Sequence, residues 1–485
     1  MLDVARYLRM SRVKVDTASR NSKDQFDIST SHHDFAGLNS TSCHGTSRPI
    51  QLKHSHKKLR LAAFTGFPGW SQTWRDPDIH ALDSLDVDYY IKFAKFAEEG
   101  KFDTLFLADG ASFPGGSFAH HLSSVSAFEP ATLLSAVATH TKHIGLVYTV
   151  STSDNEPTHI ARQLASLDHI SHGRAGWNVV TTPGPGARNL GIPVEDGKAK
   201  YKRAAAFHDA VSQLWDSYED DAFIRDKKSG IFLDMSKVHP PKIDSDLFKV
   251  SQALIVERTP QGHPVTVQAG TSPEGMALGG AVADFVYCAN YSIADGQKTY
   301  NSLKSYATAV GRNPDHLLVM TGVVVIWGET QEEAERKFEK AISAWPIDVA
   351  VQSLAFDFKG FDLDDPFPDT SEQDVRSKGR AVAITSYARS NGLTIRQAAQ
   401  HCSIGLGHRP LVGTTQSIAD NLQAWLDAEA TDGFVIQPLH IKGLQEFNEH
   451  VIPELVRRGI FRSEYEGKTL RENLGVPRPP NRYVL

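Results

Sequence analysis

At four places in the sequence, a β-branched, apolar run ends in small residues and hydrogen-bonding side chains. The polar ends are Ala108, Asp109 and Gly110, then residues 149–152, residues 178–182, and Gly270, Thr271 and Ser272. An alanine would let a flat ring approach the backbone, and Thr149 and Asn178 could hydrogen-bond the edge of a heterocycle. The fourth group precedes a predicted helix, whose free N–H groups could hold a phosphate monoester together with the hydroxyls of Thr271 and Ser272. A planar ring joined to a phosphate suggests FMN.

Taken singly, each of these stretches also has an ordinary structural explanation. Asp109 before a glycine is a common turn sequence, and Ser272 before a proline and a glutamate is a common helix N-cap. His120 and His121 lie in an insertion after the second strand and are candidates for contact with a substrate. No third ligand is spaced to complete a zinc site with them, so we predict no metal centre. The cofactor hypothesis depends on all four strand ends together.

The segments around these residues alternate between strand-like and helix-like patterns. Short apolar runs predict strands at 61–64, 104–108, 144–150, 175–181, 265–268, 285–289, 317–326 and 433–437. Amphipathic runs predict helices near 89–99, 130–141, 157–170, 201–216, 273–282, 295–310, 330–345 and 415–429. This alternation favours an α/β fold of the (β/α)8 TIM-barrel type, in which the carboxyl ends of all strands meet at one rim. A doubly wound open sheet is the alternative, but no GxGxxG motif follows the first strand.

Excess length between the predicted elements places insertions after strands 4 and 7. The first contains a hairpin-like stretch, 223–226 with 231–233, and the second covers roughly residues 350–410. The loop after the first strand carries aromatic residues that could wall a substrate pocket and favour an apolar or aromatic substrate, namely Phe67, Trp70 and Trp74. Packing at the surface is an equally good explanation of these side chains.

Three ionisable residues lie near the end of the helix predicted at 157–170. His169 is on the helix itself, where a packed structural role is a simpler explanation than a role as catalytic base. Asp168 and Arg174 flank the turn into the next strand. A buried ion pair between them and a contact with substrate both remain open.

The composition is that of a globular protein with little affinity for nucleic acid or membranes. The 485 residues carry a formal net charge of -6, and no apolar run is long enough to span a bilayer. Three cysteines without metal-ligand spacing suit a reducing compartment. Residues 1–58 are polar and contain no glutamate, which predicts a disordered or targeting extension before a single domain at 59–485. We expect a cytoplasmic protein, or an organellar one if the extension is a transit peptide.

Several longer motifs resemble those of a known enzyme family. They are SLDHISHGRAGWNVVTT at 166–182, ARNLG at 187–191, GKFD at 100–103 with FLAD at 106–109, QAGTS at 268–272, GRNP at 311–314, and PEL at 453–455 with RG at 458–459. In length and order they are similar to the nitrilotriacetate monooxygenase, dibenzothiophene sulfone monooxygenase and pristinamycin synthase group of the bacterial luciferase-like superfamily. The likeness extends from about residue 60 to the C-terminus.

The resemblance implies a (β/α)8 barrel that binds reduced FMN supplied by a separate NAD(P)H-dependent flavin reductase. In such enzymes the flavin reacts with O2 to form a C4a-(hydro)peroxyflavin, which oxygenates a small organic substrate. By the family's pattern, Ala108 and Asp109 would line the isoalloxazine, Thr149 and Asn178 would lie near its edge, and Gly270, Thr271 and Ser272 would hold the phosphate. The resemblance also implies a homo-oligomer. It names no catalytic acid or base, because the oxygen chemistry belongs to the cofactor.

One position departs from the family's pattern. Members often carry an aromatic residue, usually tyrosine, after the proline in the loop that follows strand 3, where it helps to hold the flavin phosphate. Here Thr158 follows Pro157. Its hydroxyl reaches less far, and His159 could take over the contact.

The monooxygenase hypothesis has two alternatives. One is a catalytically silent relative that only binds flavin or another small molecule, and the other is a deazaflavin-dependent oxidoreductase. A metal-dependent hydrolase would need more ligands at the strand ends than Asp109 alone.

Overall fold

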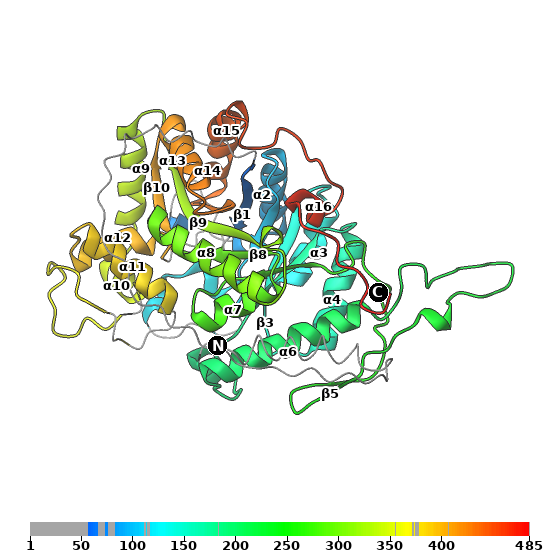
Figure 1. Ribbon diagram of the computed structural model, residues 1–485. Helices are drawn as coiled ribbons and strands as arrows, with labels where there is room; N and C mark the ends of the chain where they lie inside the picture. Colours follow the sequence, from blue (N-terminus) through cyan, green and yellow to red (C-terminus); the bar gives the residue numbers. More distant parts are fainter. Residues whose placement is uncertain are drawn as a thin grey trace, which may run out of the picture.

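Parallel strands close into a barrel at the centre of the protein (Figure 1). The computed structural model describes residues 57–65, 73–75, 83–110, 113, 117–182, 184–354, 356–370, 373, 378–405 and 407–484. The barrel order is β1-β2-β3-β4-β7-β8-β9-β11, with β11 paired back onto β1. The strands are β1 Arg60–Thr65, β2 Thr104–Leu107, β3 Gly145–Ser151, β4 Ala175–Val180, β7 Val265–Gln268, β8 Phe285–Cys288, β9 Leu318–Trp327 and β11 Gly433–Pro438. The predicted TIM barrel and all of its strands are confirmed.

A further parallel strand, β10 Arg409–Gly413, was not predicted. It pairs with the second half of β9, from Val323 to Trp327, whereas β8 pairs with β9 only as far as Thr321. β9 is therefore longer than its neighbour, and β10 takes up the hydrogen-bonding edge that β8 leaves. The sequence of β10 contains a proline and a glycine in five residues, which is why its strand pattern is weak.

The helices that surround the barrel also match the prediction. They are α2 Val87–Glu99, α3 Pro130–Ala138, α4 Pro157–Ile170, α6 Gly197–Trp215, α7 Pro273–Val282, α8 Ile293–Ala309, α9 Gln331–Ser343 and α13 Thr415–Asp427. The residues at their starts explain where they begin. Asp86, Ser272 and Thr414 are N-caps whose side chains accept hydrogen bonds from backbone N–H groups. In addition, α3, α4 and α7 have proline in the first turn. None of the helices in the described part of the chain is long and apolar enough to cross a membrane.

Both insertions lie where the sequence predicts them. After β4 come α5 Gly184–Asn189, η5 Met235–Lys237, β5 Ile243–Asp244 and β6 Lys249–Val250. The predicted hairpin forms there through a bridge between Asp226 and Ile231. After β9 come α10 Ile347–Leu354, α11 Lys378–Ser390 and α12 Ile395–Ser403, which build a small apolar core of their own around Trp345, Phe367 and Ile395. In Figure 1 these three helices gather on one side of the barrel.

The remaining short elements connect or cover the barrel. They are η1 Thr73–Arg75, η2 Asp83–Leu85, η3 Ser117–His121, η4 Ser123–Val125, η6 Pro314–His316, α14 Ile441–Glu446, the π-helix η7 Phe447–Val451, α15 Ile452–Arg457 and α16 Leu470–Leu474.

Alternation along the strands decides which side chains face the inside of the barrel. On β4, Trp177 and Val179 pack outward against the helices, so Gly176 and Asn178 face inward. The inner core contains Ala62, Phe64, Phe106, Val147, Val265, Phe285, Tyr287, Met320 and Val435. These side chains fill the interior, and a ligand can therefore enter only above them, at the carboxyl ends of the strands.

Asp168 and Arg174 are both buried, and each is held by other partners rather than by an ion pair between the two. Asp168 accepts hydrogen bonds from Gln261 Nε2 at 2.6 Å and from the Ala175 N–H at 3.0 Å. Arg174 donates to the backbone carbonyls of Ala138, Thr141, Ile144 and Ser171 and to the Thr141 hydroxyl. Arg174 therefore ties the loop between α3 and β3 to the turn between α4 and β4. Both residues are structural, and so is His169, whose Nε2 lies 3.2 Å from the Glu257 carbonyl oxygen.

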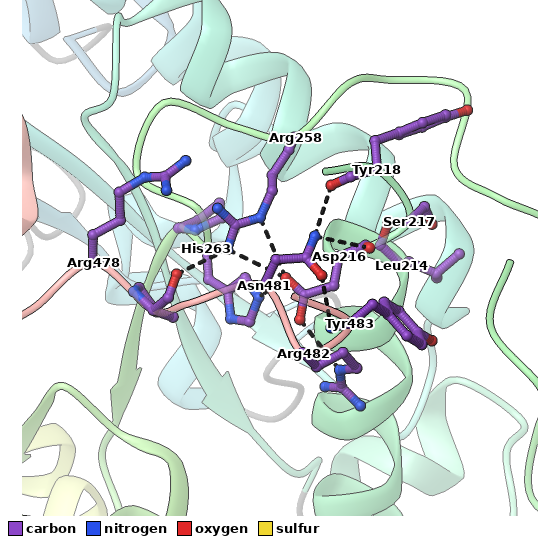
Figure 2. Close-up of polar contacts among 12 residues, drawn as sticks. Leu214, Asp216, Ser217, Tyr218, Arg258, His263, Arg478, Asn481, Arg482 and Tyr483 are labelled. Atoms are coloured by element: carbon purple, nitrogen blue, oxygen red, sulfur yellow. Dashed lines mark hydrogen bonds and ion pairs between the residues drawn. The ribbon is translucent and has the colours of Figure 1, made fainter. Parts of the chain in front are cut away.

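The last residues of the chain are anchored to the end of α6 (Figure 2). Asp216 lies 2.8 Å from His263 Nε2 and 3.2 Å from Arg482 Nε, and Asn481 donates to the Asp216 and Tyr218 carbonyls. Burial alone would raise the pKa of Asp216, but His263, Arg482 and Arg258 outweigh it and hold the pKa below its usual value. The C-terminal segment is therefore part of the folded domain.

Candidate active site

A short hydrogen-bond chain crosses the inner wall of the barrel at the carboxyl ends of β3 and β4. Asn178 Nδ2 donates to Thr149 Oγ1 at 3.0 Å, and Thr149 Oγ1 donates to the Leu107 carbonyl at 3.1 Å. Asn178 is 4% exposed, and its Oδ1 has no hydrogen-bond partner among the described residues. A buried amide oxygen without a partner costs free energy. A ligand with an N–H or O–H group at this wall would satisfy it.

The predicted phosphate site lies between β7 and α7. Ser272 Oγ accepts the Gly275 N–H at 3.1 Å as the N-cap of α7. The hydroxyl of Tyr201, from α6, lies against the same turn: a Cβ added at Gly270 would be 3.1 Å from Tyr201 Oη, and one added at Gly275 would be 3.0 Å from it. Burial raises the pKa of the Tyr201 phenol, so this hydroxyl keeps its proton as a hydrogen-bond donor. Glycine at both positions therefore makes room for a phenol beside a helix N-terminus.

The β2 side of the barrel mouth is acidic. Ala108 packs against the inner core, and the next residue, Asp109, is exposed at the rim. Desolvation raises the pKa of Asp109, the Gly110 N–H opposes this, and the carboxylates of Glu129 and Asp154 raise it further. Because the side chain is exposed, screening by solvent limits these effects. The repulsion still disfavours an anionic group on this side of the mouth.

Thr158 and His159, the two residues expected to help hold the phosphate, are at the start of α4. Both are exposed in the first turn of α4. His159 lines a groove of about 430 Å³ between α3 and α4, together with Glu129 and Arg162. The face of α4 that carries His159 is therefore turned toward α3, whereas Gly270 packs beside Tyr201 of α6.

Two of the residues predicted to contact substrate meet at the rim. Trp74 Nε1 donates to the His121 carbonyl at 3.0 Å, which joins the loop after β1 to the loop after β2. Arg75 Nη1 donates to the Ala344 carbonyl at 2.6 Å, and α10 packs against η3, which carries His120 and His121. The insertion after β9 thus closes over the same side of the mouth. Phe67 and Trp70 lie outside the described residues.

Sequence reasoning missed Tyr201. Tyr201 is far from Gly270 along the chain, and nothing in its local pattern shows that α6 passes beside the start of α7. Within the described ranges, no three His, Cys, Asp or Glu side chains lie close enough together to hold a metal ion.

Comparison with known proteins agrees with this geometry. A sequence model of luciferase-like monooxygenases matches residues 67–432. The nitrilotriacetate monooxygenase component A of Aminobacter aminovorans is 42% identical over 84% of this chain and 94% of its own length. The N-acetyl-S-(2-succino)cysteine monooxygenase of Bacillus subtilis is 40% identical over 88% of this chain and 99% of its own length.

A solved structure of a riboflavin lyase with modified FMN and riboflavin superposes with a TM-score of 0.79 at 31% identity, covering 87% of this chain and 97% of that one. Fold, rim geometry and sequence similarity over most of the chain therefore agree. The chain belongs to the luciferase-like monooxygenase family and is a flavin-dependent monooxygenase.

Proposed function

We propose that this chain is the oxygenase component of a two-component system. It takes reduced FMN from a separate NAD(P)H-dependent flavin reductase and uses O2 to oxygenate a small organic substrate. The observation that carries the proposal is the buried, unpaired Oδ1 of Asn178 on the inward face of β4. It lies at the barrel rim, where enzymes of this fold bind their ligands.

The residues at the rim fit the chemistry of FMN. The edge of the isoalloxazine offers both N–H donors and carbonyl acceptors, which the Asn178 amide can meet, with Thr149 holding that amide in place through the 3.0 Å hydrogen bond. Ala108 leaves space for a flat ring. The hydroxyls of Thr271, Ser272 and Tyr201 at the start of α7 supply donors for a phosphate.

The protein's own contribution is positioning and exclusion of water. Bound reduced FMN supplies the electrons with which one atom of O2 is transferred to the substrate while the other leaves as water. Phe64, Phe106 and Tyr287 close the barrel beneath the site, and their rings pack at centroid distances between 5.6 and 6.3 Å. The contact between Trp74 and His121 closes part of its upper wall. Such an enclosure keeps bulk water from the reacting groups.

Anaerobic titration of the protein with photoreduced FMN tests the proposal. We expect saturable binding by the wild type, about tenfold weaker binding by Asn178→Leu because one hydrogen bond worth about 1.4 kcal/mol is lost, and little change in Asn448→Leu. Asn448 is a matched control: it also donates one hydrogen bond, to the Phe96 carbonyl, and also has an unpaired Oδ1, but it lies in the outer helix layer.

The loaded protein is then mixed with O2 in the presence and absence of candidate substrates. Reoxidation of the bound flavin should yield oxygenated product when a substrate is present. Failure of the wild type to bind reduced FMN would refute the proposed function, and equal losses in the two asparagine variants would refute the placement of the flavin at Asn178.

A further inference from the structure

Part of the insertion after β4 forms a two-stranded ribbon that projects beyond the helices around the barrel (Figure 1). This ribbon, the arm, covers residues 217–239 between α6 and β5. Backbone hydrogen bonds join its two strands: the His239 N–H donates to the Ser217 carbonyl at 2.7 Å, and the Asp226 N–H donates to the Ile231 carbonyl at 2.8 Å. An isolated hairpin of two strands is only marginally stable in water. A surface that packs on the arm would therefore stabilise it.

The base of the arm is fixed to the folded domain. Asn481 Nδ2 donates to the Tyr218 carbonyl at 2.7 Å (Figure 2), and Arg258 Nη1 donates to Asp220 at 2.9 Å. The side chains of Tyr218 and Ala222 are buried. Beyond Ala222, most side chains of the arm are exposed. The domain thus holds the outer half of the arm out in a defined direction.

The outer half of the arm exposes large apolar side chains on both of its faces. The guanidinium of Arg225 lies 5.1 Å from the centre of the Phe223 ring and 5.5 Å from that of Phe232, so these three residues share one face. By the alternation of strand residues, Ile224 and Ile231 point to the other face. No arrangement of the arm on its own barrel could bury both faces.

These side chains form an apolar patch. A fifth member, Ile255, is two residues before Glu257, whose carboxylate binds Arg225. The exposed fractions are 50% for Ile224, 51% for Ile231, 61% for Phe232, 72% for Met235 and 74% for Ile255. At roughly 100 Å² for each half-exposed side chain of this size, the apolar patch measures roughly 500 Å². A patch of this extent is typical of an interaction site.

The area of the apolar patch suits a contact between two copies of the chain. A twofold contact that covered most of the patch in both copies would bury about 800 Å² of apolar surface. Because about 60% of an interface is apolar, the whole contact would bury about 1,300 Å². Stable interfaces bury about 1,200–2,000 Å².

A second copy can match the apolar patch only with its own arm. Elsewhere in the described part of the chain, the exposed large apolar side chains are spread singly over separate elements, such as Leu85, Val194 and Phe361. They offer no comparable patch among the described residues. The contact is therefore expected to be symmetric, with the same surface on both sides, which closes after two copies.

The charges of the arm favour a second copy over a membrane and indicate its orientation. Residues 217–239 contain five acidic and four basic residues, so the arm has no net attraction for anionic lipid. Lys227 and Lys228 are at the tip, whereas Glu219, Asp220 and Asp221 are at the base. Two arms packed antiparallel place each tip beside the base of the other. The acids already bind cations of their own chain, so their charge sets orientation more than strength.

We infer that the arm is a dimerisation element, which packs antiparallel on the arm of a second copy of this chain. Ile224, Ile231, Phe232 and Met235 form the apolar centre of the contact, and Ile255 extends it onto the body of the domain. The inference is independent of the proposed flavin site, because no residue of the arm lies at the barrel rim.

Sedimentation of the full chain over a range of micromolar concentrations tests the inference. We expect the wild type to have at least twice the mass of one chain. Phe232→Ser and Ile231→Ser, which change both copies at once, should each weaken association about a hundredfold or more. The double variant Lys227→Glu, Lys228→Glu should weaken it about tenfold, and less at high salt. All of these side chains are exposed, so binding of reduced FMN should be unchanged.

The matched control is Phe361→Ser. Phe361 is 48% exposed and lies in the insertion after β9, which Figure 1 shows on the opposite side of the barrel from the arm. It should leave association unchanged. A second measurement needs no variant: backbone amides of residues 222–236 should exchange with solvent more slowly at high protein concentration than after dilution, whereas amides of α9 should not change.

Three results would overturn the inference. The first is a wild type that is monomeric at every concentration; if that monomer bound vesicles of phosphatidylcholine and phosphatidylglycerol, the apolar patch would belong to a lipid surface instead. The second is equal association of Phe232→Ser and Phe361→Ser, which would place the contact elsewhere. The third is amide exchange in the arm that does not depend on concentration. None of them bears on the proposed function, which the titration with reduced FMN decides separately.

Discussion

The imidazole of His208 gives the protein a pH-dependent stability whose size can be worked out from its surroundings. His208, on α6, is stacked on Trp177 with ring centroids 5.8 Å apart, and its Nε2 lies 3.2 Å from Thr266 Oγ1. Thr266 Oγ1 accepts the Trp177 Nε1–H at 3.3 Å and can donate its own proton to His208 Nε2 when the imidazole is neutral. Burial is the main reason that the pKa of His208 falls to about 3, and the nearby His263 lowers it further. The titrating ring is packed between Trp177 and Thr266, which keeps water from it.

The direction of the effect follows from the two pKa values. In the unfolded chain, histidine has a pKa near 6.5. Below that pH the unfolded state binds a proton at this residue, whereas the folded state does not. The contribution to stability is complete above about pH 6.5 and is lost progressively as the pH falls from 6.5 toward 3. At pH 5, which is about 1.5 pH units below the unfolded pKa, the loss is about 2 kcal/mol at about 1.4 kcal/mol per unit.

The assay is urea unfolding of the wild type and of His208→Gln at pH 7 and pH 5. The glutamine can still accept the Thr266 hydroxyl proton but does not titrate. We expect the free energy of unfolding of the wild type to fall by about 2 kcal/mol more than that of the variant between the two pH values. His140→Gln, at an exposed position after α3, controls for the removal of a histidine as such. Equal pH dependence of the wild type and His208→Gln would refute the reasoning.

Three further predictions concern the flavin site and the buried polar network. Gly270→Ala places a Cβ 2.4 Å from Gln268 Nε2 and 3.1 Å from Tyr201 Oη, so reduced FMN should bind about tenfold more weakly in the anaerobic titration; unchanged affinity would place the phosphate elsewhere. Arg174→Met leaves four loop carbonyls without their donor and should cost about 3–5 kcal/mol in thermal unfolding, whereas a loss below about 1 kcal/mol would show that these bonds matter little. Asp216→Asn should lower the free energy of unfolding by about 2–4 kcal/mol, because the buried Arg258, 7% exposed, loses a charged partner. This cost should shrink in acid, as the pH approaches the pKa of the wild-type carboxyl. A cost that does not depend on pH would contradict the ion-pair explanation.

The barrel could be predicted from the sequence because each of its strands and helices has a recognisable pattern in its own residues. The strand from Ala175 to Val180 is preceded by Gly173, whose φ of +90° ends the turn after α4, and α7 begins at a serine followed by proline. β10 could not be predicted, because a proline and a glycine weaken its strand pattern and because its pairing depends on the extra length of β9. Local patterns thus located the strands of the barrel and missed β10, which pairs with the second half of β9.

The candidate site divides in the same way. Thr149 and Asn178 follow strands, and parallel topology alone places them on one wall, where the structure joins them by a hydrogen bond. Tyr201 reaches the start of α7 from α6. Its position is set by packing that no local pattern encodes.

An unpaired buried polar atom is not by itself a sign of a binding site in this protein. Asn448 Oδ1 in the outer helix layer and Tyr148 Oη on the outward face of β3 are also without partners among the described residues, and neither is near the barrel mouth or in it. Asn178 differs because its unpaired oxygen is on an inward face, at the carboxyl end of a strand, and beside a second strand end shaped by two glycines. The binding hypothesis therefore depends on the coincidence of these features. This is why Asn448→Leu is the decisive control: if it weakened reduced FMN binding as much as Asn178→Leu, the loss would report general destabilisation, and the rim would lose its strongest support as the flavin site.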